Sequence, residues 1–184
     1  MDRTARSSRG TLRISAKTDY ALRALTELAA IPPGHGLVKG DRIAAAQGIP
    51  VRFLETIMVE LRRAQIVESR RGTEGGYALA RPPSEIALAD VIRALDGPLA
   101  SVCGTAPETL DYAGSAGALR EVWVATRAAL RGILENTTLA DVALNQLPRE
   151  VMTMVTDPAA WVSSELTRSR RHTPADDNGA VVTQ

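Results

Sequence analysis

The chain contains 184 residues, and because only 3% of them are aromatic, its core must be built mainly from aliphatic side chains and alanine. A formal net charge of +1 excludes a globally basic protein, so any basic surface for nucleic acid must be local. One cysteine excludes an internal disulfide framework, and the longest apolar runs are too short to cross a membrane. We therefore expect a mainly helical, cytoplasmic protein without a membrane partner.

The first half of the chain is predicted to begin with an arm and two helices. Residues 1–12 are polar and basic and are expected to form a disordered arm. The first helix begins near Ser15, which can cap it, and has an apolar face of Ala21, Ala24, Leu25 and Leu28. It ends at IPPGHG, residues 31–36, where proline and glycine favour a loop. A short second helix is expected over 40–47, followed by a tight turn over 48–50.

A third helix follows Pro50, whose fixed φ suits a first helical turn. The polar side chains Arg52, Glu55 and Thr56 lie near its start, off the apolar face. That face consists of Leu54, Ile57, Met58 and Leu61. Two short helices joined by a few residues that include glycine are typical of a helix-turn-helix.

A β-hairpin is predicted directly after the third helix. Residues 66–70 (IVESR) and 77–81 (YALAR) alternate as strands do, and GTEGG, residues 72–76, forms the turn between them. Arg70 and Arg71 place positive charge at the base of this turn. A hairpin in this position is a wing, and its glycines allow the tip to bend tightly and to approach another backbone closely.

The second half of the chain is predicted to contain one long helix between shorter or irregular segments. An amphipathic helix within residues 84–98 ends at glycine and proline, and residues 99–117 read as a loop. A long helix over about 118–134 precedes a short capped helix over 137–144. The long helix carries an apolar stripe that suits packing against a second helix: Leu119, Val122, Trp123, Thr126, Leu130 and Ile133.

The predicted fold class is therefore mainly α with a small β-hairpin wing: a winged helix-turn-helix followed by a long C-terminal dimerisation helix. Helical turns near Val151 and Ala160 are the regular structure expected in the tail. The expected organisation is a disordered arm over 1–12, a winged helix-turn-helix domain over 13–97, a sensor or linker loop over 98–117, a dimerisation helix and short terminal helix over 118–146, and a mostly disordered tail over 147–184.

Five segments stand in an order and spacing that are highly specific when taken together: LRISAKTDYALRAL, IAAAQGIPVRFLETIMVELRRAQIV, RRGTEGGYALARP, DVIRALDGPLA, and LREVW followed by TTLADV. On these segments, which span residues 12–144, the chain resembles the Rrf2 family of winged-helix transcription regulators. The resemblance implies a homodimer on a pseudo-palindromic operator in double-stranded DNA. Each recognition helix would enter a major groove, each wing would lie over a minor groove, and the long helix would cross its partner at the dimer interface.

The resemblance also implies that Arg52, Glu55 and Thr56 contact DNA at the exposed start of the recognition helix. A carboxylate in a major groove is useful as an acceptor, for example from a cytosine N4 amine, so Glu55 would read sequence. Arg52 would reach a guanine or a phosphate. The alternative is that Glu55 is a solvated residue that pairs with Arg52 or Arg62.

Four further residues are candidate contacts. The resemblance implies that Arg71, at the wing base, contacts DNA, and a narrow minor groove would attract it. The alternative for Arg70 and Arg71 is that they only keep an edge strand soluble. Lys17 and Thr18, near the start of the first helix, are candidates for phosphate contacts, although Lys17 is equally well explained as a solvated lysine.

Many members of the family hold an iron–sulfur cluster with three cysteines in the loop before the long helix. Here only Cys103 falls near the first of those positions, and the later ones, near Asp111 and Gly117, hold small or acidic residues. Clusters typically take four ligands, mostly thiolates, and a dimer of this chain has two thiols. We therefore expect no metal site and no cofactor, and Cys103 is either a structural residue or, if exposed, a redox sensor.

The sequence contains no nucleophile–base pair, phosphate-binding loop or metal-ligand spacing that would indicate an enzyme. We expect a homodimeric, sequence-specific transcription regulator, and a repressor rather than an activator, whose effector the sequence leaves open. One alternative is a winged-helix module that binds proteins and has lost DNA binding. A second alternative is a redox regulator that senses through Cys103.

Overall fold

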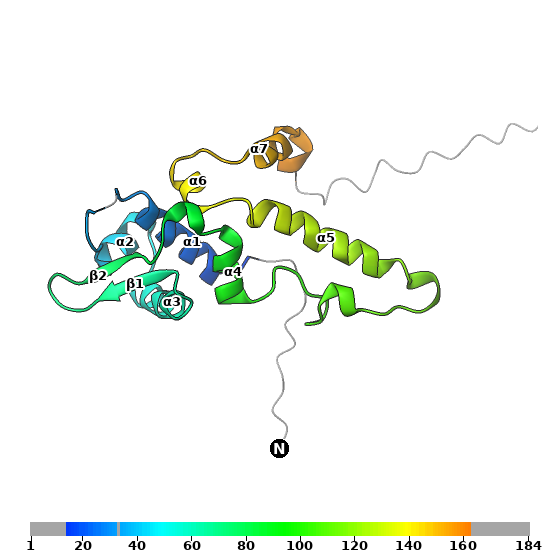
Figure 1. The fold of residues 1–184 in the computed structure, drawn as a ribbon, viewed down its shortest axis with the longest axis horizontal. Coiled ribbons are helices and arrows are strands. Elements are labelled where there is room, and N and C mark those ends of the chain that lie inside the picture. The colour runs from blue at the N-terminus through cyan, green and yellow to red at the C-terminus, as the bar shows by residue number, and fades with distance from the viewer. Residues whose placement is uncertain (1–13, 33, 163–184) are drawn as a thin grey trace, which may run out of the picture. The chain divides into compact units, whose positions relative to one another are not determined.

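The computed structural model describes residues 14–32 and 34–162. Within them the chain is mainly helical with one antiparallel hairpin, which confirms the predicted fold class (Figure 1). The helices are α1 (Ala16–Ala29), α2 (Gly40–Gln47), α3 (Val51–Arg63), α4 (Leu88–Asp96), α5 (Leu119–Leu134), α6 (Leu139–Ala143) and α7 (Arg149–Thr156). The strands are β1 (Val67–Arg70) and β2 (Gly76–Leu79), and short 3₁₀ turns lie at Pro83–Glu85, Pro107–Thr109, Gly114–Ala116 and Pro158–Trp161.

The helix-turn-helix forms as its end signals predict. Ser15 caps α1, and its hydroxyl accepts a hydrogen bond from the Thr18 amide at 3.1 Å. Gly48 ends α2 in the left-handed conformation with φ of 62°, where glycine carries no steric penalty. Pro50 then directly precedes α3. The arm predicted over residues 1–12 lies outside the described residues.

One hydrophobic core joins α1, α2, α3, α4 and α6. Its most enclosed members include Leu25, Ile57, Leu61, Ile86 and Leu139. Leu139 belongs to α6, which starts with a capping box between Thr138 and Asp141. The Leu139 amide donates to the Ile86 carbonyl at 3.0 Å. The sequence places this short helix in one segment with the dimerisation helix, but α6 packs in the winged-helix core.

Strands β1 and β2 pair antiparallel, with Val67 opposite Leu79 and Arg70 opposite Gly76. Residues 71–75 therefore form the wing turn. The base of the hairpin is also joined to the segment before α2, because Val38 forms an isolated antiparallel bridge with Tyr77. The wing thus has a main-chain attachment to the helix-turn-helix in addition to its covalent connection.

Helix α5 differs from the core helices because none of its residues is buried. Its C-terminal end is joined to α4, where Arg93 forms an ion pair with Glu135. Figure 1 shows the rest of α5 extending past the winged-helix elements. None of the helices in the described ranges is long and apolar enough to cross a membrane.

The chain divides into a unit that ends at Pro148 and a second unit that begins at Arg149. In the second unit, α7 is followed by a turn that Asp157 caps, and the Trp161 indole donates to the Val155 carbonyl at 2.8 Å. The helical turns expected near Val151 and Ala160 are present as α7 and the 3₁₀ turn Pro158–Trp161, whereas the predicted disorder of the remaining tail is not tested. Residues 163–184 lie outside the described residues.

Candidate nucleic-acid interface

Helix α3 has one apolar face and one polar face. Leu54, Ile57, Met58 and Leu61 are at most 1% exposed and anchor the helix in the core. Arg52, Glu55 and Thr56 are all exposed on its first two turns. The Thr56 hydroxyl donates to the Arg52 carbonyl at 3.1 Å, which is an intrahelical bond that leaves the side chain at the surface. The predicted contact residues of α3 therefore share one accessible surface.

Glu55 does not form the ion pair that we considered as its alternative role. Within residues 14–32 and 34–162, no hydrogen bond or ion pair joins its carboxylate to Arg52 or Arg62. Arg62 instead lies 3.4 Å from the Ser69 hydroxyl on the wing. Glu55 is therefore exposed at the surface of α3, and its role in reading bases stays a prediction.

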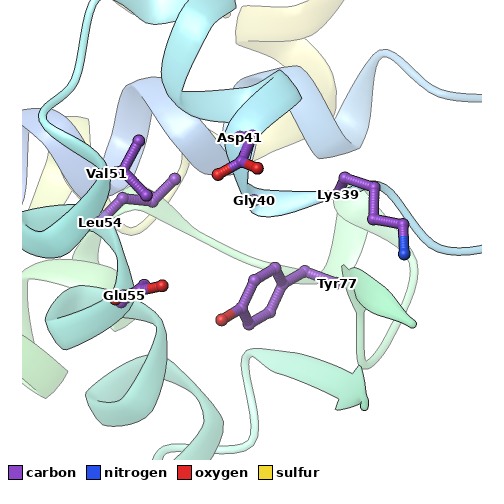
Figure 2. A pocket seen from close by; sticks show the side chains of 7 residues that line it. All are labelled: Lys39, Gly40, Asp41, Val51, Leu54, Glu55 and Tyr77. Atoms are coloured by element: carbon purple, nitrogen blue, oxygen red, sulfur yellow. The ribbon is translucent and has the colours of Figure 1, made fainter. Parts of the chain in front are cut away.

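A small cavity of about 140 Å³ lies between α3, the start of α2 and the wing. Figure 2 shows the side chains that line it, with Glu55 and Val51 from α3, Asp41 from α2, and Tyr77 from β2. Small-molecule sites usually enclose roughly 300–1,000 Å³. This cavity is smaller than that range, so we interpret it as the gap that separates the recognition helix from the wing.

Two wing glycines are required by the protein's own backbone. A Cβ on Gly75 would lie 2.2 Å from the Arg70 carbonyl oxygen, and one on Gly76 would lie 2.5 Å from the Val38 carbonyl oxygen. We expected these glycines to allow close approach to another backbone. The structure shows that Gly75 approaches the backbone of Arg70 and Arg71 within the wing itself, whereas Gly76 approaches Val38 in the segment before α2. The second approach fixes the base of the wing.

Arginines lie near the wing turn, although the turn itself contains Glu74 and β1 contains Glu68. Arg70 and Arg71 are both exposed, one at the end of β1 and the other at the start of the turn. Arg62 and Arg63 are exposed on the last turn of α3. Between residues 39 and 81 the sequence holds eight lysines and arginines against five acidic residues. This surplus of three positive charges is modest, which predicts limited counterion release and an affinity that depends on shape and base contacts.

Lys17 is partly buried, and its ammonium is bound by other groups of the protein. Its ammonium donates to a Glu60 carboxylate oxygen at 3.0 Å and to the Leu95 carbonyl at 2.8 Å. Its side chain is only 28% exposed. Lys17 therefore joins α1 to α3 and to the end of α4, and the suggestion of a phosphate contact is not supported.

Thr18 is also unsuited to a phosphate contact, because it is completely buried. Its hydroxyl donates to an Asp96 carboxylate oxygen at 2.7 Å, and the Ser15 hydroxyl donates to the other oxygen at 2.8 Å. Asp96 thus occupies the positive N-terminal end of α1, where a phosphate would otherwise be attracted. A carboxylate at this position would repel the DNA backbone.

The predicted dimer stripe is accessible along α5. Leu119 and Val122 are 41% and 50% exposed, whereas Trp123, Thr126, Leu130 and Ile133 are half-buried. The Trp123 indole nitrogen is buried and has no hydrogen-bond partner among the described residues. The apolar side of α5 is therefore incompletely covered by the chain itself.

The loop over 98–117 packs against α5. Pro107 is buried, and Glu108 forms an ion pair with Arg127 of α5. The Glu108 backbone amide and the Arg127 guanidinium both donate to this carboxylate and lower the pKa of Glu108. Cys103 is exposed at a tight turn closed by two hydrogen bonds of 3.0 Å between Val102 and Thr105. Its thiol is accessible, as the redox alternative requires.

Two residues at the candidate interface were missed by the sequence analysis. Lys39 lies at the start of α2 and donates to carbonyls of the wing turn, and Tyr77 lines the cavity beside Glu55. Neither stands out in the sequence, since a lysine before a helix and a tyrosine in a strand are common. Their positions follow from the pairing of Val38 with Tyr77, which joins segments far apart in the chain.

Comparison with known proteins places the chain among transcription regulators. The Rrf2 family profile, described as an iron-dependent transcriptional regulator, matches residues 14–145. A Mycobacterium tuberculosis protein named among the HTH-type transcriptional regulators is 50% identical over 159 residues, which cover 86% of this chain and 98% of that protein. The HTH-type regulator CymR of Bacillus subtilis is 36% identical over 72% of this chain and 90% of its own length.

Solved structures agree with this placement. The structure of CymR, described as the global cysteine regulator of B. subtilis, matches with a TM-score of 0.63 at 36% identity, over 73% of this chain and 98% of that one. IscR of T. potens matches with a TM-score of 0.58 at 32% identity, over 77% and 96% of the respective chains.

The family description implies iron, but the donor groups of this chain do not fit a conventional iron–sulfur site. The chain has one cysteine, whereas such clusters typically take four ligands that are mostly thiolates. In the part of the chain that the structure describes, no group of three or more histidine, cysteine, aspartate or glutamate side chains is placed to hold a metal ion.

Proposed function

The chain belongs to the Rrf2 family of DNA-binding transcription regulators, and on this premise we propose that it acts as a homodimeric, sequence-specific repressor in the cytoplasm. The observation that carries the proposal is α3, which buries its apolar face and exposes Arg52, Glu55 and Thr56 beside the wing that holds Arg70 and Arg71. Repression needs no further surface, because a dimer bound over a promoter excludes the polymerase.

Helix α5 supports the homodimer. A helix in water gains most of its stability from packing an apolar face, yet no residue of α5 is buried within the chain. A second copy would cover the stripe through two-fold symmetry, which brings the same residues of both copies together. The two copies of Val122, half exposed in one chain, would lose that exposure in the dimer.

The dimer would read a pseudo-palindromic operator. Two recognition helices related by two-fold symmetry fit successive major grooves when they lie about 34–36 Å apart, which corresponds to half-sites separated by roughly 10 base pairs. Each α3 would direct its first two turns at the base edges. Glu55 would accept a hydrogen bond from a cytosine N4 amine and would penalise bases that lack a donor there.

The wing would contact the neighbouring minor groove through Arg71, with Arg70 beside it. Minor grooves that are narrow concentrate negative potential and attract arginine side chains. The attachment of the wing base at Val38 supports this role, since a fixed hairpin directs the charged turn more accurately than a loose one.

The signal is proposed to act through the loop over 98–117, because this loop joins α4 to α5 and is anchored on α5 by the pair of Glu108 and Arg127. We propose that a conventional iron–sulfur cluster is not the sensor. Oxidation of the exposed Cys103 is one candidate signal, and a small molecule or a partner protein at the loop is the other.

Titration of the full-length protein onto labelled duplexes at several salt concentrations tests DNA binding. Arg71→Ala should weaken binding to the preferred duplex by about 1–3 kcal/mol, the scale of one specific contact. Arg149→Ala, which removes the same charge from α7, is the matched control and should bind as the parent does. A parent that prefers no duplex over heparin would refute DNA recognition and would favour a protein-binding module.

A further inference from the structure

The turn of the wing is held by a side chain from outside the hairpin. The Lys39 ammonium donates to the Gly72 carbonyl at 3.2 Å and also to the Thr73 carbonyl. Within residues 14–32 and 34–162, no other side chain donates to a carbonyl of residues 71–75. Lys39 directly precedes α2, so it connects the wing turn to the first helix of the helix-turn-helix.

Hydrogen bonds of the neighbouring residue fix the backbone of Lys39 close to the wing. Its neighbour Val38 exchanges two main-chain hydrogen bonds with Tyr77, of 2.9 Å and 2.8 Å. The Tyr77 ring also lies against Gly40, since a Cβ there would be 3.3 Å from a ring carbon. Figure 2 shows Lys39 and Tyr77 together on the wing side of the small cavity. Lys39 therefore extends from a fixed point at the base of the wing.

The turn itself has little else to order it. Its internal bond runs from the Gly75 amide to the Gly72 carbonyl at 3.0 Å, and Gly72 has φ of 100°. Glycine loses more conformational freedom on ordering than other residues, so a glycine-rich turn benefits strongly from an added contact. Arg71 precedes Gly72, and the direction of its side chain depends on the backbone that Lys39 holds.

We propose that Lys39 is a positioning residue that orders the wing turn before DNA binds and thereby sets the direction of Arg71. The inference rests on the proposed function, because it assumes that the wing contacts a groove. Lys39 would add to affinity by reducing the ordering needed on binding, rather than by a phosphate contact of its own. Lys39 is exposed like the arginines of the surface, but its ammonium is engaged by the wing turn, whereas the arginines would act through their charge.

The first test needs no DNA. Hydrogen exchange of the full-length protein, followed by mass spectrometry, should show faster exchange over residues 72–75 in Lys39→Met, which keeps the stem but removes the donor. Lys39→Arg, which retains a donor, should exchange more slowly than Lys39→Met. Arg42→Met removes one positive charge from α2 and should exchange as the parent does. Equal exchange in Lys39→Met and the parent would overturn the proposal.

The second test uses a duplex that the parent prefers. Lys39→Met should weaken binding roughly 3- to 10-fold, on the scale of losing one ordered group. The salt dependence should stay unchanged, and in an Arg71→Ala background the substitution should have no further effect. Two results together would make Lys39 a phosphate contact and overturn the proposal. The slope of log affinity against log salt concentration would fall in magnitude by about 0.9, and the fold-changes caused by Lys39→Met and Arg71→Ala would multiply in the double variant. A parent that prefers no duplex refutes the proposed function, whereas unchanged exchange refutes only the role of Lys39.

Discussion

Replacing Thr18 with valine tests whether the start of α1 is an internal junction or a surface for phosphate. Valine has the shape of threonine but lacks the hydroxyl that donates to Asp96 at 2.7 Å. Hydrogen bonds to charged groups contribute about 1.5–3 kcal/mol. The Ser15 hydroxyl and water remain available to Asp96, which is exposed, so the lower part of that range applies. We expect the free energy of unfolding to fall by about 1.5–2 kcal/mol.

Equilibrium denaturation at a fixed protomer concentration measures this effect, because the stability of a dimer depends on concentration. Thr153→Val is the matched control, since Thr153 is exposed and its hydroxyl bonds only to the Arg149 carbonyl within α7. We expect the control to change stability by less than about 0.5 kcal/mol. DNA affinity of Thr18→Val should equal that of the parent at temperatures where both are folded. Parental stability combined with weaker DNA binding would contradict the structural role and restore Thr18 as a phosphate contact.

Three further substitutions address recognition, assembly and signal. Glu55→Ala should relax base preference at one symmetric pair of operator positions, as read by selection from random duplexes; selected sites identical to those of the parent would make Glu55 an ordinary surface residue. Val122→Asp places a charge on the α5 stripe and should yield monomers by light scattering. The control Val162→Asp, at an exposed site outside α5, should remain dimeric. A dimeric Val122→Asp would remove α5 from the interface. Cys103→Ser should resist operator release by peroxide if the exposed thiol is the sensor, and equal release from parent and variant would discard that idea.

The fold was largely predictable because its signals are local. Ser15, Gly48 and Pro50 mark helix ends, and the apolar periodicity of α3 identifies the face that is buried. The glycines of the wing likewise fix the hairpin turn, although the structure was needed to show that Gly76 is required by the approach of Val38. These features depend on residues that are neighbours in the chain, so they can be predicted from the sequence.

The errors arise where distant segments meet. Lys17 and Thr18 look like accessible residues at a helix start, but Leu95 and Asp96, nearly 80 residues later, take up their polar groups. In the same way, the packing of Leu139 in the core depends on its pairing with Ile86, which no local pattern reveals. Burial and hydrogen bonding across such separations follow from the tertiary fold alone.

Selection of bound duplexes from a random pool, using the full-length protein, tests the central claim most directly. A dimer that presents paired α3 helices and wings predicts inverted repeats whose half-sites lie roughly 10 base pairs apart, centre to centre. Enrichment of a single unrepeated half-site, or no enrichment at all, would contradict the account.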